Sequence, residues 1–235
     1  MKILISPLAS SSKGNGYLVG DGETTLLIEC GVSPSIVRKK IPLTDIDAAL
    51  VTHEHSDHAG YVCKYLKYFK IYASKGTCEA IKSKSVVNCR YNLLIADYKG
   101  FKINTFNIIP FKVNHDAAEP VGYYIHSSVA NENLVFITDT YYVSNTFDKL
   151  NTIMIECNYS QEILDRNTSL NPVVKKRLLR SHFSLGNVKK FLKHNDLSKV
   201  DAIYLMHLSN GNSNERLFKK EIEELTGIPV VVCPE

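Results

Sequence analysis

The motif THEHSDHAG (52–60) places three of the chain's eight histidines within six residues, with an aspartate among them. Its polar residues are His53, His55, Asp57 and His58. The apolar stretch before it, DAALVT (47–52), predicts a short strand, and the helical spacing of apolar residues over 62–69 predicts a helix. The motif therefore lies in a loop between a strand and a helix, where functional sites are commonly built.

Histidine nitrogens and aspartate oxygens are common ligands of divalent metal ions. Alternating residues of an extended segment point to the same side, so His53 and His55 can converge on one ion, while Asp57 and His58 can reach a second. Three imidazoles this close would repel one another when protonated and have little structural use. A single histidine at a strand end usually has no function, but with this motif present we expect further ligands after other apolar strands, namely His115, Asp139 and His207.

Composition sets the broad class. With 44% hydrophobic and 22% charged residues, the 235-residue chain is typical of a globular protein, and we expect one domain over residues 1–235. The N-terminal apolar run is too short for a signal peptide and no stretch suits a membrane span, so we expect a cytoplasmic protein without a membrane partner. The six cysteines contain no Cys-x-x-Cys pair and are expected to be reduced thiols. The net charge of +4 is compatible with a polyanionic partner but does not establish one.

The order of elements favours an α/β protein. Strands are predicted at 2–6, 16–20 and 24–30, separated by a Ser/Gly loop at 9–16 and a turn at Asp21-Gly22. Further strands are predicted between 93 and 138, at 152–157, at 200–208 and in IPVVVC, with helices after Ser33, at 173–180, at 185–194 and at 214–227. This order favours two sheets face to face with helices outside.

The motif THEHSDHAG resembles the signature loop of the metallo-β-lactamase superfamily. Four further blocks, LASSSKGNGYLV, MIECNYSQEIL, KKRLLRSHFSLGNVKKFL and IYLMHLSNGNSNE, resemble the YycJ (WalJ) branch, small proteins related to RNase J and RNase Z, and its phage and prophage members in particular. The resemblance covers nearly the whole chain and implies a four-layer αββα sandwich with two mixed sheets. It also implies that one ion is held by His53, His55 and His115, the other by Asp57, His58 and His207, and that Asp139 bridges them.

The chain departs from this family at two places. The second long strand of the family usually ends in Asp-x-Gly, whereas this chain has Glu29 in the acidic position, which leaves the hydrogen bonding of the longer side chain open. The Gly-Asn-Cys or Gly-Asn-Ser of the family is Gly14-Asn15-Gly16 here. These residues could offer backbone N–H groups to a phosphate or could form only a turn.

The expected chemistry is that of a two-metal hydrolase. Two divalent ions about 3.5–4 Å apart lower the pKa of a shared water, so that a bridging hydroxide can attack a phosphoryl group. Asp57, as a ligand, and His182, as general acid to the leaving oxygen, are the expected catalytic residues, because His182 matches the His-hydrophobic-Ser block of the family. The alternative is that His182 only packs beside the helix cap Ser184. Zinc is the favoured metal and manganese the alternative, and His126 and His194 are expected to have no role.

The expected function is a 5′-directed exonuclease on single-stranded DNA or RNA. A basic surface around His182 would attract a phosphodiester backbone, although such residues often form only a solvated helix face. Its members are Lys175, Lys176, Arg177, Arg180, Lys189, Lys190 and Lys193. Two alternatives are a phosphodiesterase for cyclic nucleotides or other small phosphodiesters, and a metal-stabilised binding protein without turnover. The chain lacks the length for an added nucleic-acid clamp domain, so a homodimer is a further means of gripping a long strand.

Overall fold

The computed structural model describes residues 1–84 and 92–235, and the chain divides into two units. Unit 1 comprises residues 1–112, 117–132 and 234–235, and unit 2 comprises residues 113–116 and 133–233. The single domain expected over residues 1–235 stays a prediction. In the described part of the chain, no helix is long and apolar enough to cross a membrane.

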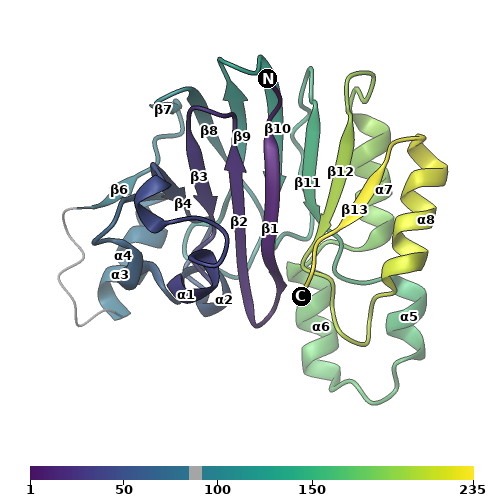
Figure 1. Cartoon of the computed structure of the whole chain (residues 1–235). Coiled ribbons are helices and arrows are strands. Elements are labelled where there is room, and N and C mark those ends of the chain that lie inside the picture. The colour runs from purple at the N-terminus through teal and green to yellow at the C-terminus, as the bar shows by residue number, and fades with distance from the viewer. Residues whose placement is uncertain (85–91) are drawn as a thin grey trace. The chain divides into compact units, whose positions relative to one another are not determined.

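Unit 1 is built on a six-stranded mixed sheet in the order β1-β2-β3-β4-β5-β6 (Figure 1). Its first three strands pair antiparallel and the others parallel. The strands are β1 (Leu4–Ser11), β2 (Gly14–Gly20), β3 (Thr25–Ile28), β4 (Ala48–Leu50), β5 (Lys70–Ala73) and β6 (Leu93–Ile95). The helices are α1 (Pro34–Val37), η1 (Leu43–Asp45), α2 (Ser56–Ala59), α3 (Val62–Tyr65) and α4 (Lys75–Lys84). Their buried faces form one apolar core with the sheet.

An antiparallel set of strands packs against this sheet within unit 1. Its members are β7 (Phe101–Ile103), β8 (Phe106–Lys112) and β9 (Val121–Ser127). The buried Tyr123 of β9 donates its hydroxyl to the backbone oxygen of Val51 at 2.7 Å. Asp21, in the β2–β3 turn, accepts from the hydroxyls of Thr105 and Ser127, each at 2.7 Å. Burial opposes its ionisation, but these hydrogen bonds lower the pKa of Asp21 below its usual value. The turn thus joins the two layers.

Unit 2 has a parallel set of strands in the order β13-β12-β11-β10. These are β10 (Glu132–Ile137, whose first residue belongs to unit 1), β11 (Thr152–Glu156), β12 (Ala202–Met206) and β13 (Val230–Val232). The helices are α5 (Gln161–Arg166), α6 (Pro172–Ser181), α7 (Leu185–His194) and α8 (Glu215–Thr226). Parallel strands place their carboxyl ends at one edge of the sheet, which is where open α/β sheets bind ligands.

The predicted elements are largely confirmed, with two kinds of difference. The predicted loop at 9–16 is wrong, because β1 and β2 continue as a hairpin with a two-residue turn at Ser12-Lys13. Helix α5 was not predicted, although its cap Ser160 accepts from the backbone N–H of Ile163 at 3.1 Å, a pattern that SQEI signals. Helices α4 and η1 and strand β5 were not predicted either.

The cysteines that the structure describes are free thiols, as predicted. Burial raises the pKa of Cys30 and Cys157 well above the ordinary thiol value, which keeps both protonated and unreactive. Cys89 lies outside the described residues.

Candidate functional site

The predicted ligand loop, residues 52–58, follows β4 and runs into α2 in unit 1. His53 and His58 are buried, with exposed fractions of 1% and 0%, whereas His55 is half-buried. The ring centroid of His53 lies 4.6 Å from that of His55 and 4.2 Å from that of His58. The structure therefore brings the three imidazoles together, and Asp57 Oδ2 lies 3.3 Å from His58 Nε2.

Glu29 at the end of β3 fixes the tautomer of His53 through Thr52. The Thr52 hydroxyl donates to Glu29 Oε1 at 2.6 Å, so its oxygen accepts from His53 Nδ1 at 3.0 Å. His53 Nε2 then carries a lone pair, which faces His55 Nδ1 at 3.0 Å. Two imidazole nitrogens facing each other in this way provide the start of a cation site.

Glu29 also lies beside His58. The longer side chain, in place of the Asp of the family, therefore still reaches the ligand loop. Its Oε1 lies 3.3 Å from His58 Nδ1, and Asn15 Nδ2 lies 3.2 Å from His58 Nε2. Asn15 Nδ2 also donates to the backbone oxygen of Asp57 at 3.2 Å. Gly14-Asn15-Gly16 is thus part of the support of the ligand loop.

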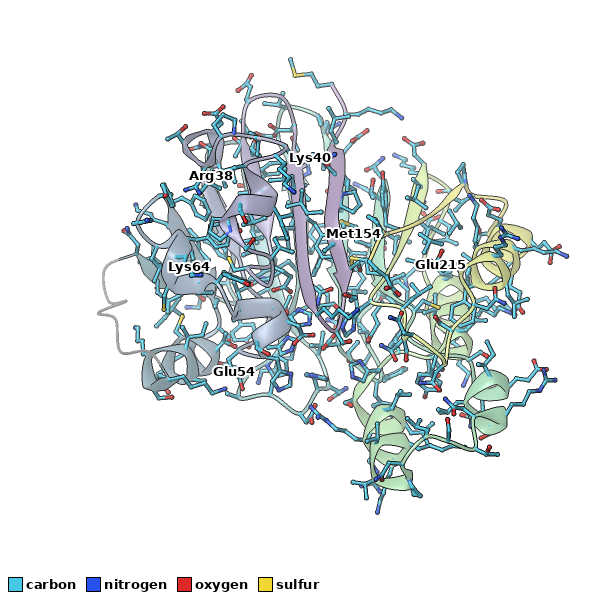
Figure 2. All side chains as sticks on the ribbon, turned by 60° about the horizontal axis from the view of Figure 1, so that its bottom comes forward. Arg38, Lys40, Glu54, Lys64, Met154 and Glu215 are labelled. Atoms are coloured by element: carbon cyan, nitrogen blue, oxygen red, sulfur yellow. The ribbon has the colours of Figure 1, made fainter. Side chains whose placement is uncertain are left out.

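Gly31 allows the ligand loop to lie against the end of β3. A Cβ at this position would lie 1.6 Å from the backbone oxygen of Asp57, so only glycine fits. The Cys30 N–H donates to the backbone oxygen of His58 at 2.7 Å, and the Tyr61 N–H donates to that of Cys30 at 2.9 Å. The ligand loop is also held by one of its own residues, Glu54, which is labelled in Figure 2. Its Oε1 accepts a hydrogen bond from the Ala118 N–H at 2.9 Å.

In unit 2, the carboxyl ends of three parallel strands bring the other candidate residues together. Asp139 follows β10, Glu156 ends β11 and His207 follows β12. His207 Nδ1 lies 2.9 Å from Asp139 Oδ1 and 3.1 Å from Glu156 Oε1. Asp139, Glu156, His182 and His207 each offer a ligand atom within 4.8 Å of the others, a group suited to a divalent ion.

Glu156 was not predicted as a site residue, yet it organises this group of residues in unit 2. Its side chain has an exposed fraction of 0%. Oε1 accepts from His182 Nδ1 at 2.6 Å, and Oε2 accepts from the backbone N–H groups of Phe183 at 2.9 Å and Thr140 at 3.1 Å. The signal that could have found it is the carboxylate ending the apolar strand TIMIE, the same position that pointed to Asp139 and His207.

The pKa values of Glu156 and His182 shift in opposite directions because the two groups form a buried pair. Burial alone would raise the pKa of Glu156, but the charge of His182 and the hydrogen bonds from His182 and His207 lower it. Burial alone would lower the pKa of His182, but the neighbouring Glu156 carboxylate raises it. The pair therefore favours a charged imidazolium beside a carboxylate.

His115 is held by the end of α6. Its Nδ1 donates to the backbone oxygen of Ser181 at 2.8 Å, which leaves a lone pair on Nε2. His115 Nε2 lies 3.5 Å from Asp139 Oδ2 and 3.3 Å from Asp116 Oδ1. Asp116 accepts from Arg177 Nε at 2.7 Å; burial opposes ionisation of Asp116, but this bond lowers its pKa. His115 thus presents the same kind of nitrogen as His53.

Several residues of the candidate site have a strained backbone conformation. Among the described residues, six non-glycine residues have a left-handed backbone, and three of them, Glu29 (φ 69°), Asp139 (φ 41°) and His207 (φ 52°), are site residues. Such a backbone costs of order 1–3 kcal/mol and clusters at functional sites. The fold holds these three side chains in conformations that the isolated residues would avoid.

Comparison with known proteins fits this geometry. A model of the β-lactamase superfamily domain matches residues 24–208. The chain belongs to the metallo-β-lactamase superfamily. Exodeoxyribonuclease YycJ of Bacillus anthracis is 31% identical over 241 residues, which cover 96% of this chain and 89% of that protein. Exodeoxyribonuclease WalJ of Streptococcus pneumoniae serotype 2 (strain D39) is 30% identical, covering 90% of this chain and 84% of that protein. The predicted branch is confirmed; the resemblance to its phage members stays a prediction.

A solved structure supports the same fold. The metallo-β-lactamase fold protein YhfI from Bacillus subtilis matches with a TM-score of 0.75 and 14% identity, covering 100% of this chain and 98% of that one. The predicted α/β class with two mixed sheets is thereby confirmed. As a member of the metallo-β-lactamase superfamily the chain is a metal-dependent hydrolase, and its histidine and carboxylate clusters suit divalent metal binding.

The predicted basic surface around His182 carries less free charge than its sequence indicates. Lys175 pairs with Asp165 at 2.9 Å, Arg177 pairs with Asp116, and Lys189 pairs with Glu221. Three of the seven predicted cations are therefore neutralised by neighbouring carboxylates within unit 2. His194, expected to have no role, lies at the end of α7 with Nδ1 2.7 Å from the backbone oxygen of Lys190.

Proposed function

We propose that the chain is a two-metal-dependent phosphodiesterase that acts as a 5′-directed exonuclease on single-stranded nucleic acid in the cytoplasm. The observation that carries the proposal is the set of imidazoles whose other ring nitrogen is already bonded, as in His53 and His115. Such pre-set tautomers are characteristic of metal ligands. The two relatives named as exodeoxyribonucleases favour DNA over RNA, and the 5′ polarity is carried over from the expectation drawn from the sequence.

We infer the ligand assignment from donor chemistry and from the family pattern. His53, His55 and His115 would hold one ion, Asp57, His58 and His207 the other, and Asp139 would bridge them. The ions, zinc or manganese, would lower the pKa of a water molecule and neutralise charge on the phosphate. Within the chain, Glu29 and Asn15 keep the ligand loop in place, so that the nitrogens need not reorganise when metal binds.

His182 is the proposed proton donor to the leaving oxygen. Glu156 binds its Nδ1 at 2.6 Å, which directs Nε2 away from Glu156 and fixes the ring plane. The side chain is 18% exposed, so it can meet a substrate while still buried enough to be held. The carboxylate stabilises the imidazolium form, which is the form that can donate a proton.

Two alternatives share part of this site. The same residues could hydrolyse a cyclic nucleotide or another small phosphodiester, and the same metal could stabilise a binding protein without turnover. The described residues favour turnover, because a purely structural zinc site is normally closed by four ligands, whereas this chain provides seven predicted ligands and a positioned histidine. Homodimer formation stays a prediction.

The test is incubation of the zinc-loaded and manganese-loaded protein with 5′-labelled and 3′-labelled single-stranded DNA and RNA, beside a panel of cyclic nucleotides. Asp57→Ala is the control that removes a ligand. We expect stepwise release of nucleotides from the 5′ end, lost in the variant. Intact polymers with a consumed cyclic nucleotide would contradict the exonuclease activity. If no substrate is hydrolysed, the assignment of the chain as an enzyme is contradicted.

A further inference from the structure

Two segments of unit 1 that flank the ligand loop in the sequence carry a dense group of cations. The segments SPSIVRKKI (33–41) and YVCKYLKYFK (61–70), which contain α1 and α3, carry six cations and no acidic residue. All six are exposed. We call this group the α1–α3 basic surface; its members are Arg38, Lys39, Lys40, Lys64, Lys67 and Lys70. Figure 2 labels three of them, Arg38, Lys40 and Lys64.

Tyrosines, not carboxylates, contact three of these six cations. Arg38 donates to the hydroxyl of Tyr68 at 2.6 Å, and its guanidinium carbon lies 5.5 Å from the centre of that ring. Lys67 Nζ lies 5.1 Å from the same ring centre, and Lys64 Nζ lies 4.8 Å from that of Tyr61. A ring orients a cation without cancelling its charge. Among the described residues, none of the six forms an ion pair with a carboxylate.

This sets the α1–α3 basic surface apart from the cations around His182. There, three of the seven cations, Lys175, Arg177 and Lys189, each face a carboxylate. A phosphate that binds one of these must compete with the resident carboxylate, whereas a phosphate near Arg38 or Lys64 meets an uncompensated charge. The gain from releasing counterions on binding nucleic acid is therefore larger at the α1–α3 basic surface.

A cavity of about 380 Å³ lies next to α1 and to residues that adjoin the ligand loop. Its lining includes Lys13 at the β1–β2 turn, Gly31, Ile36 of α1 and Tyr61. Gly31 is the residue that lies against the backbone of Asp57, and Tyr61 comes three residues after His58. Glu235 also lines the cavity and contributes an acidic group at that end.

We propose that the α1–α3 basic surface binds the phosphate backbone of a single-stranded nucleic-acid substrate and leads the strand to the ligand loop. This inference rests on the proposed nuclease function and names the surface that grips the polymer. The cations neutralise successive phosphates, and the ring of Tyr68, 36% exposed, offers a face on which a base can stack. The surface thereby gives the chain a hold on a long substrate.

The test compares two variants that each remove three positive charges. The first is Arg38→Gln with Lys64→Gln and Lys67→Gln. The matched control is Arg216→Gln with Lys219→Gln and Lys220→Gln on α8, whose lysines pair with Glu223 and Glu224 at 3.7 Å each. Both sets lie on the surface, so net charge changes equally and only its position differs. Urea unfolding and bound metal check that both variants fold.

Binding is measured without turnover, by fluorescence anisotropy of a labelled single-stranded DNA in EDTA over a range of salt concentrations. For the first variant we expect at least tenfold weaker binding and a log-log salt slope smaller by roughly 0.7 for each phosphate that the variant no longer neutralises. The α8 variant should bind like the wild type. Equal weakening in both variants, or no weakening in either, would overturn the inference.

The two proposals fail in different ways. If the wild type binds DNA through the α1–α3 basic surface but cleaves no polymer with either metal, the proposed exonuclease is wrong and the binding surface stands. If the wild type cleaves polymers and the first variant binds and cleaves them as well as the α8 variant does, the surface assignment is wrong and the nuclease stands.

Discussion

At the residue scale, the hydrogen bond between Glu156 and His182 gives the sharpest expectation about chemistry. If His182 protonates the leaving oxygen, His182→Ala should lower kcat about 10²- to 10⁴-fold on a natural phosphodiester, whose alkoxide leaves poorly. It should spare a nitrophenyl phosphodiester, whose leaving group needs little help. Steady-state kinetics on the two substrates measures the difference. His194→Ala is the matched control, because it removes an exposed histidine from the end of α7.

Two outcomes would remove His182 from this role. One is an equal reduction of kcat on both substrates. The other is a loss of bound metal in His182→Ala, which would indicate that the side chain is a metal ligand. Such a role is chemically possible, because His182 belongs to a group of four potential ligands with Asp139, Glu156 and His207.

Also at the residue scale, the sequence could predict which side chains meet but not how they are held. The alternation of His53 and His55 along an extended segment predicted that these two side chains converge, and the structure places the ring of His58 beside His53 as well. The hydrogen bond from Thr52 to Glu29 depends on how β3 and β4 align across 23 residues of sequence, which no local pattern encodes. Glu156 could have been found from the apolar strand TIMIE that it ends, but its partners, which come from three separate segments, could not.

At the element scale, strand ends explain why a few positions carry the site. β3 and β4 in unit 1, and β10, β11 and β12 in unit 2, each deliver a site residue at or just after their last residue. Apolar runs followed by a polar residue could therefore be read from the sequence. Helix α2 lies within the motif that was predicted as a loop, and α3, with four residues, is shorter than the helical spacing over 62–69 suggested.

The close approach of the ligand loop to the end of β3 predicts an effect of Gly31→Ala. The added Cβ would clash with the backbone of Asp57, so the loop must move. We expect the free energy of unfolding to fall by about 1–3 kcal/mol, as for other overpacked sites, together with a loss of bound metal. Urea unfolding in EDTA measures the first effect and metal analysis the second.

Gly186→Ala is the control for this change. The nearest atom to an added Cβ there, Ser184 Oγ, lies at 3.8 Å, an ordinary van der Waals distance, and the residue lies within α7. Alanine should leave the stability of the protein unchanged or raise it by about 0.4–1 kcal/mol. If Gly31→Ala behaved like Gly186→Ala, the close approach of β3 to the ligand loop would not matter for the site.

At the scale of the whole molecule, the family and the fold class were within reach of the sequence, and the assignment of the metal ligands stays a prediction. The distribution of free charge was not within reach of the sequence. Both basic groups look alike as sequence, but carboxylates pair with three of the seven cations around His182, as Glu221 does with Lys189. The ring of Tyr68, by contrast, contacts Arg38 and Lys67 without neutralising their charges. Only the tertiary structure shows which cations of each group are paired with a carboxylate.

The measurement that tests the central claim most directly is the number of metal ions bound per chain. The protein is loaded with zinc, freed of excess by gel filtration and analysed by mass spectrometry of the metal, beside the variants Asp57→Ala and His115→Ala. We predict two ions per wild-type chain and fewer than two in each variant, because each change removes a ligand from a different ion. One ion or none in the wild type, or two ions retained in both variants, would contradict the two-metal site.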